Sequence, residues 1–300
     1  MRRREVITLL GGTTTWPLAA HAQQAGMPVI GFLNAASPEA FTNYLAGFRQ
    51  GLGQVGFVEG NNTRIAYRWA RGRYDALPSL AAELVALKVD VIAANGGARS
   101  AIAAKAATAE IPIVFTFGDG DPVTYGLVES FRRPGGNVTG VTMIAGTLEP
   151  KRMELLREIA PKATVVYMLI NPTNAGIKQD LPQVEAAARN MGLGLQVISA
   201  ATEAEIDAAF NTIAAQHAQA LMVANDVFLT VQATRLATHA LRLGLPTIFP
   251  WREQAAAGGL MSTGQAFVKH IGNQASTSVK FSRGENRQIC LCSNLQNLSW

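Results

Sequence analysis

Residues 89–101 read VDVIAANGGARSA, and this stretch indicates the fold class of the chain. It begins with small and branched apolar residues in an almost unbroken run, which is typical of a strand buried on both faces of a parallel sheet. An asparagine and two glycines follow, and a helical pattern begins after them. Strand, polar turn and helix in this order form the repeating unit of a doubly wound α/β fold.

The same unit recurs along the chain in two groups. The predicted strands cover residues 28–33, 63–69, 89–95, 111–117 and 137–143, then 164–171, 195–200, 220–226, 246–250 and 259–264. The predicted helices cover residues 39–55, 77–88, 100–109 and 123–131, then 151–159, 181–191, 203–217 and 227–243. We therefore predict an α/β protein with two doubly wound parallel-sheet lobes joined by a hinge near residues 142–150. The expected division is a leader at 1–22, lobes at 23–142 and 143–265, and a return segment with a tail at 266–300.

Length and charge limit the classes of protein to consider. The chain has 300 residues, of which 48% are hydrophobic, enough to bury the cores of two domains. The formal net charge is +5, but the excess lies in the first 22 residues and after Val268, so residues 23–268 are neutral overall. A protein that binds nucleic acid carries positive charge on its folded body. We therefore expect no nucleic-acid partner.

The first 22 residues have the order of an export signal. Basic MRRRE is followed by an apolar run over residues 6–20 and by Ala-His-Ala at 20–22, a small-x-small cleavage signal. The stretch that begins at Arg3 resembles a twin-arginine signal, so the Sec and Tat routes both stay open. A membrane anchor is the alternative, but the apolar run is short for a bilayer. We expect cleavage near Ala22 and a periplasmic body.

Polar side chains follow predicted strands in both halves, at Asn34, Asn95, Asp119, Asn171 and Asn225. In open parallel sheets the ligand lies beyond the carboxyl ends of the strands, so these side chains could line a crevice. Asparagine is also a common turn and helix-cap residue, which is the simpler reading of any one of them. As a set drawn from both halves, they indicate two binding edges that face each other.

The stretch NGGARSA, residues 95–101, follows a strand and opens a helix. Its N–H groups could hold a carboxylate, with Ser100 adding a hydroxyl, or it could be an ordinary glycine-rich connection. The glycines of residues 132–140 precede a strand, whereas a Rossmann phosphate loop follows one. No phosphate-binding P-loop motif occurs in the sequence.

Catalytic motifs are missing from the sequence. Neither a G-x-S-x-G elbow nor an H-E-x-x-H motif occurs. Acidic residues near predicted strand ends suit an ammonium group better than hydrolysis, since no nucleophile or metal-ligand set accompanies them; they are Asp119, Asp121, Asp226 and Glu253. Trp251 either stacks on a ligand or packs at the lobe edge. We expect a protein that is not an enzyme and binds no metal or cofactor.

Many separate motifs occur in a fixed order from Met1 to about Val268. They include RRREVITLLGG, PVIGFLNAASPEAF, FRQGLGQVGFVEGNN, YRWARGRYDALPSLAAELV, GDPVTYGLV, RPGGNVTGVT, KRMELLREIAP, NPTNAG and FPWREQAAAGGLMSTG. Together they resemble the exported substrate-binding proteins of ABC transporters. The branch they resemble has many uncharacterised members and some that bind aromatic amino acids.

The resemblance implies a hinged, two-lobed binding protein of the type I periplasmic kind, monomeric and without catalytic activity. It would capture a small molecule, an amino acid or a carboxylate, between its lobes and deliver it to an ABC permease in the inner membrane. An exported domain that presents ligand to a signalling receptor is the alternative. The ligand contacts expected on this basis are Asn34, Ser37, Gly97, Ser100, Asp119, Asp121, Asn171, Asn174, Asp226, Trp251 and Glu253.

The last part of the chain departs from that resemblance after Val268. It holds the two cysteines of the sequence, Cys290 and Cys292, in a polar segment. Two thiolates fall short of the four ligands of a structural zinc site, so a metal half-site is the weaker reading. A shift of one base before Lys269 would restore Ala-Tyr-Arg, which resembles the family's continuation. We expect the tail to be a frameshift product and poorly packed.

Overall fold

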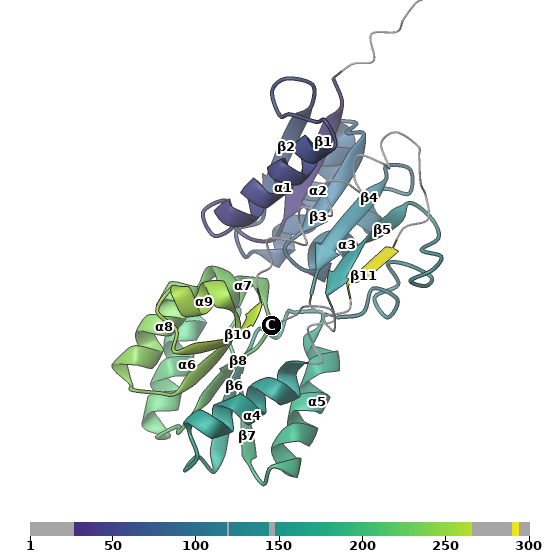
Figure 1. Ribbon diagram of the computed structural model, residues 1–300. Helices are drawn as coiled ribbons and strands as arrows, with labels where there is room; N and C mark the ends of the chain where they lie inside the picture. Colours follow the sequence, from purple (N-terminus) through teal and green to yellow (C-terminus); the bar gives the residue numbers. More distant parts are fainter. Residues whose placement is uncertain (1–26, 119, 144–147, 266–289, 294–300) are drawn as a thin grey trace, which may run out of the picture.

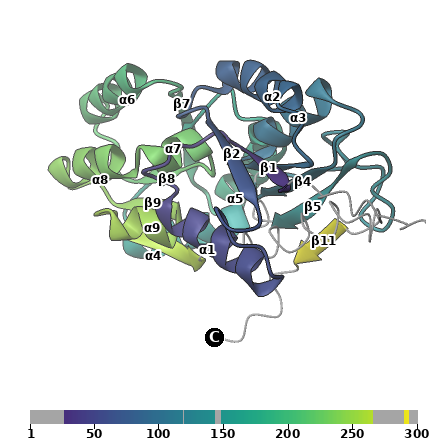
Figure 2. The same ribbon diagram turned by 90° about the horizontal axis from the view of Figure 1, so that it is seen from above.

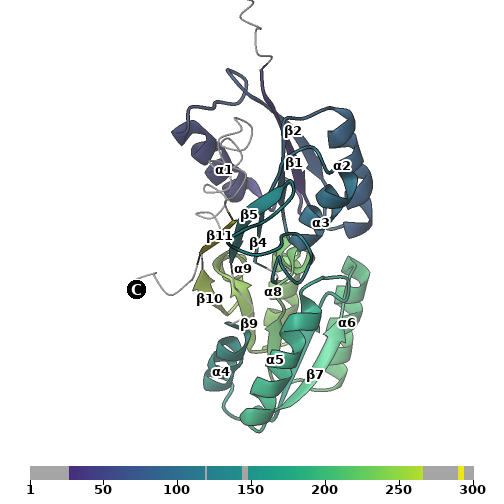
Figure 3. The same ribbon diagram turned by 90° about the vertical axis from the view of Figure 1, so that its right-hand side faces the viewer.

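The computed structural model describes residues 27–118, 120–143, 148–265 and 290–293. The chain forms two α/β lobes, which lie one above the other in Figure 1 and in the side view of Figure 3. The first lobe contains a six-stranded sheet and the second a five-stranded sheet, and the strand pairs of both sheets are parallel. The prediction of two doubly wound lobes is therefore confirmed. The expected leader lies outside the described residues.

The sheet of the first lobe has the strand order β11-β5-β4-β3-β1-β2. Its strands are β1 (Val29–Asn34), β2 (Arg64–Trp69), β3 (Val91–Asn95), β4 (Ile113–Phe117), β5 (Val138–Met143) and β11 (Cys290–Ser293). The helices of this lobe are α1 (Thr42–Gln54), the short 3₁₀ helix η1 (Tyr74–Ala76), α2 (Leu77–Ala86) and α3 (Ala98–Ala107). Helix α1 covers one face of the sheet, and α2 and α3 cover the other (Figure 2).

Alternating side chains of β1 show how the sequence builds these two layers. Phe32 points to the α1 side, where its ring lies 5.1 Å from that of Phe48. Leu33, the next residue, packs on the other face with Leu84 of α2. Every residue of β3 and β4 is buried, because helices cover both faces of the central strands.

The sheet of the second lobe has the strand order β10-β9-β8-β6-β7. Its strands are β6 (Val165–Ile170), β7 (Gly194–Ser199), β8 (Leu221–Val223), β9 (Thr247–Trp251) and β10 (Met261–Gln265). Its helices are α4 (Glu149–Ile159), α5 (Ile177–Asn190), α6 (Glu203–Ala215), α7 (Val227–Val231), α8 (Ala233–Arg242) and α9 (Arg252–Ala256). In the described part of the chain, no helix is both long and apolar enough to cross a membrane.

Two of the predicted helices are wrong. Residues 123–131 form turns, because Gly126 has φ +64° and the carboxylate of Asp121 accepts hydrogen bonds from Val123 N–H and the Thr124 hydroxyl, which fold the chain back locally. The predicted helix over residues 227–243 is split at Gln232 into α7 and α8. The break lets α7 turn toward the other lobe.

Part of the tail also differs from expectation. Residues 290–293 form β11, which pairs with β5 in the register Cys290↔Gly140 to Ser293↔Met143. These four residues pair with β5 through their backbone, because an open sheet edge offers unpaired N–H and C=O groups. The expected poor packing of the tail stays a prediction. The remainder of the tail lies outside the described residues.

Candidate functional site

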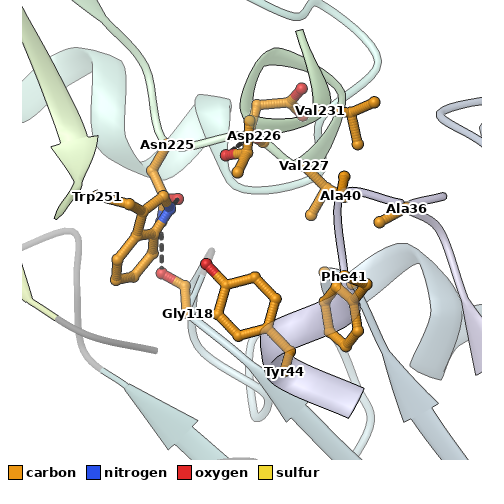
Figure 4. A pocket seen from close by; sticks show the side chains of 13 residues that line it. Ala36, Ala40, Phe41, Tyr44, Gly118, Asn225, Asp226, Val227, Val231 and Trp251 are labelled. Carbon is orange, nitrogen blue, oxygen red and sulfur yellow. Dashed lines mark hydrogen bonds between the residues drawn. The ribbon is translucent and has the colours of Figure 1, made fainter. Parts of the chain in front are cut away.

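A cavity lies between the two lobes, where the carboxyl ends of both sheets face each other. Its volume is about 50 Å³. One water molecule needs about 10–15 Å³, so the cavity could hold several. The first lobe contributes Ala36, Ala40, Phe41, Tyr44, Gly96, Gly97 and Gly118 to its wall, and the second contributes Asn225, Asp226, Val227, Thr230, Val231 and Trp251 (Figure 4). The dimensions suit a small molecule.

The turn between β3 and α3 forms one wall and requires glycine. Gly96 has φ +71°, and a Cβ there would lie 2.3 Å from Oδ1 of Asn34. That oxygen accepts a hydrogen bond of 2.7 Å from the Ala36 N–H, which tightens the turn after β1. Gly97 is the N-cap residue of α3, so the start of this helix faces the cavity. The helix dipole makes such a position favourable for a negative group.

Three aromatic side chains line the cavity. Phe41 and Tyr44 come from the start of α1, with ring centroids 4.7 Å apart, and Trp251 ends β9 in the other lobe. The indole N–H of Trp251 donates to Oδ1 of Asn225 at 3.1 Å. Figure 4 shows Tyr44 and Trp251 approaching the cavity from opposite lobes. The rings supply flat apolar walls with polar edges.

The two lobes contact each other around the cavity. The amide of Asn225 donates to the carbonyl of Gly118 at 2.9 Å, and Nε of Arg99 donates to the carbonyl of Thr173 at 2.9 Å. The phenol of Tyr44 is hydrogen-bonded to the Glu253 carboxylate. The arrangement is therefore a closed one.

Two carboxylates lie at this interface in unlike environments. Burial raises the pKa of Asp226, although hydrogen bonds from Leu229 N–H, Tyr74 and Asn171 work in the opposite direction. Burial also raises the pKa of the Tyr44 phenol, and the negative charge of Glu253 adds to that effect. Oε2 of Glu253 is buried and has no hydrogen-bond partner within the described residues. A cationic group of a ligand would stabilise both carboxylates.

The expected contact residues divide into several groups. Gly97, Asp226 and Trp251 line the cavity. Asn34, Ser37, Asp121, Asn171 and Asn174 accept hydrogen bonds from backbone N–H groups two or three residues further on, as turn and cap residues do. Ser100 is fully buried, with no partner for its hydroxyl in the described part of the chain. Glu253 reaches the interface through Tyr44, and Asp119 lies outside the described residues.

Sequence reasoning missed Phe41 and Tyr44 and left Asn225 out of the contact set. All three carried a readable signal. The aromatic pair lies at the start of the helix that follows the first strand, and Asn225 lies two residues after the end of β8, directly before Asp226. Both places border the crevice of a doubly wound fold. Within the described ranges, no group of three or more His, Cys, Asp or Glu residues is placed to hold a metal ion.

The sequence itself places this site within a known family. Residues 29–286 match the family model described as ABC transporter substrate binding protein. The chain belongs to this family. Its members are substrate-binding proteins rather than enzymes, in agreement with the resemblance noted in the sequence. The match continues past Val268, so the expectation that the resemblance ends there is wrong.

A curated relative supports this assignment of an ABC substrate-binding protein. The chain is 27% identical over 223 residues, 74% of its length, to a protein named tyrosine-binding protein from Clostridioides difficile (strain R20291). The aligned part spans 63% of that relative's own length.

Solved structures show the same fold. A conserved domain protein from Vibrio cholerae has a TM-score of 0.80 at 23% identity, covering 89% of this chain and 90% of the other. An ABC domain in complex with L-Trp from Streptococcus pneumonia has a TM-score of 0.78 at 19% identity, covering 89% of each chain. The ligand-free, open structure of a substrate-binding protein with adhesive properties from Clostridium difficile has a TM-score of only 0.59 at 25% identity, again covering 89% of each chain. The lower score against an open structure agrees with lobes that are closed here.

Proposed function

We propose that this protein is the exported binding component of an ABC transporter, which captures an amino acid or a small carboxylate between its lobes and delivers it to a permease. The observation that carries the proposal is the cavity whose walls come from both lobes. Such a cavity is complete only when the lobes close, so ligand capture and closure are one event.

The lining groups suggest how such a ligand would lie. The rings of Phe41, Tyr44 and Trp251 suit an apolar side chain, and aromatic faces also attract a nearby cation. Asp226 and Glu253 suit an ammonium group. A carboxylate would lie at the start of α3, where Gly97 opens the helix. The other expected contacts, which are Asn34, Ser37, Ser100, Asp119, Asp121, Asn171 and Asn174, stay a prediction.

Export completes the proposal. A binding protein that serves a permease must reach the outer side of the membrane, and the leader-like order of residues 1–22 supplies a route. We propose cleavage near Ala22, through Sec or Tat, and a monomeric periplasmic protein. N-terminal sequencing of the exported protein should therefore begin at Gln23, and an intact Met1 on a cytoplasmic product would contradict export.

A thermal-shift screen of the mature protein against amino acids and small carboxylates tests the ligand class. A true ligand should raise the melting temperature, because it binds the folded state alone. Calorimetry of the hits should then show weaker binding after Trp251→Ala. The matched control is Tyr167→Phe, which alters an aromatic residue hydrogen-bonded to Gln216 within the second lobe, away from the cavity lining.

Uptake of the ligand by cells that lack the gene distinguishes transport from signalling. Deletion of the gene should abolish uptake of the identified ligand if the protein serves a permease. Unchanged uptake, with a lost response to the ligand, would favour the sensing alternative. If none of the substitutions Asn171→Ala, Asp226→Ala and Trp251→Ala alters the affinity, the site is placed wrongly.

A further inference from the structure

The carboxylate of Asp226 accepts hydrogen bonds from both lobes. Within its own lobe, Oδ1 accepts from Leu229 N–H at 2.9 Å, which caps α7, and from the Asn171 amide at 3.2 Å. From the first lobe, the hydroxyl of Tyr74 donates to Oδ2 at 2.8 Å. Asp226 is only 2% exposed, so its charge depends on these donors in place of water.

Tyr74 reaches this carboxylate from outside the cavity. It lies in η1, between β2 and α2, and is absent from the cavity lining. Tyr74 and Asp226 are 152 residues apart in sequence, and their side chains meet only because the lobes are in contact. Asp226, by contrast, lines the cavity wall. The hydrogen bond therefore connects the ligand site to the lobe interface.

Helix α7, which Asp226 caps, packs against the first lobe. Val227 packs against apolar side chains on both faces of the first sheet, and Val231 packs on the α1 side. Phe228 approaches the turn at Gly72, where an added Cβ would lie 3.2 Å from its ring. Opening of the lobes would separate all of these groups and expose α7.

We propose that Tyr74 is a positioning residue of this site, which holds the Asp226 carboxylate in place only in the closed arrangement and thereby raises the fraction of closed molecules before ligand binds. The part that concerns ligand affinity rests on the proposed function. Tyr74 would then influence affinity without touching the ligand.

The physical reason is the different environment of Asp226 in the two arrangements. When the lobes are open, water can solvate the carboxylate and the phenol separately. When they are closed, a buried carboxylate oxygen without its donor costs more than the loss of an ordinary hydrogen bond. Because the measured dissociation constant is the intrinsic one divided by the closed fraction, a less populated closed state weakens binding proportionally.

The first test needs no ligand. In ligand-free protein, hydrogen exchange at the amides of α7 and the radius of gyration from small-angle X-ray scattering both report opening. Tyr74→Phe should exchange roughly tenfold faster at Leu229, since a hydrogen bond to a charged group is lost from the closed state. It should also show a larger radius. Tyr167→Phe is the matched control: it loses one phenol hydrogen bond, of 2.6 Å to Gln216, inside one lobe and should change neither reading.

The second test uses L-tyrosine and L-tryptophan as probes in calorimetry. With a probe that binds the wild type, Tyr74→Phe should weaken the affinity roughly tenfold, and faster dissociation should account for it. Adding Tyr74→Phe to Asp226→Asn should then cost clearly less than adding it to the wild type, because the two groups act through one contact.

The outcomes separate this inference from the proposed function. If neither probe binds the wild type, the proposed ligand class loses support, while the exchange and scattering data still decide the role of Tyr74. If Tyr74→Phe folds with a wild-type circular dichroism spectrum and matches the wild type in exchange and radius, the inference is overturned. A loss of melting temperature without any opening would assign Tyr74 a purely structural role and overturn it as well.

Discussion

A buried ion pair at the start of α4 offers the sharpest test of how the second lobe is stabilised. The guanidinium of Arg152 is 2% exposed and contacts the carboxylate of Glu149, which is fully buried. Burial lowers the pKa of Arg152 to about 9, and the negative charge of Asp180 opposes the shift. Removing one partner of a buried pair costs about 3–5 kcal/mol. Because Asp180 stays nearby, we expect Glu149→Gln to lower the free energy of unfolding by about 3 kcal/mol.

Chemical denaturation at pH 7 measures this loss. The matched control is Glu154→Gln, which breaks an exposed ion pair with Lys151 on the same helix and should cost less than about 0.5 kcal/mol. Both variants replace a glutamate of α4 by glutamine, so they differ chiefly in burial of the partner. If Glu149→Gln costs no more than Glu154→Gln, the charge of Arg152 is compensated by groups other than Glu149, and the reasoning fails.

Further predictions concern charge, backbone and ligand. Burial raises the pKa of Asp180 to about 6 from 3.8, so the stability it contributes is fully present below pH 3.8 and is lost as the pH rises through 6. Melting curves should therefore show that stability falls as the pH rises from 4 to 7, by up to about 3 kcal/mol. Asp180→Asn should remove this pH dependence. Gly96→Ala should lower the free energy of unfolding by about 2–4 kcal/mol, since φ is +71° and the added Cβ would clash with Asn34. The control is Gly192→Ala, where φ is also positive but the added Cβ meets no atom; it should lower the free energy of unfolding by only about 1–2 kcal/mol in the same denaturation assay. Trp251→Ala should weaken a bound amino acid at least tenfold in calorimetry, and unchanged affinity would place the ligand elsewhere.

The sequence determined the layers of the fold. Apolar runs such as residues 111–117 indicate strands that are buried on both faces of a sheet, and the helices between them favour parallel strands. The glycines after β3 predict a tight turn. Glycine is required at position 96 because φ is positive there and because an added Cβ would clash with Asn34. The positions of Gly97, Asp226 and Trp251 near predicted strand ends also place them at the crevice, and all three line the cavity.

The tertiary structure decided which of those residues meet. The side-chain oxygens of Asn34 and Asn171 accept hydrogen bonds within their own turns, an outcome that short-range sequence patterns allow but do not choose. The contact between Tyr74 and Asp226 has no local pattern, because it depends on how two separately folded lobes approach each other. The same holds for Tyr44 and Glu253. Periodicity reports the environment of one segment, whereas an interface is a property of two, so these pairs become visible only when both lobes are in place.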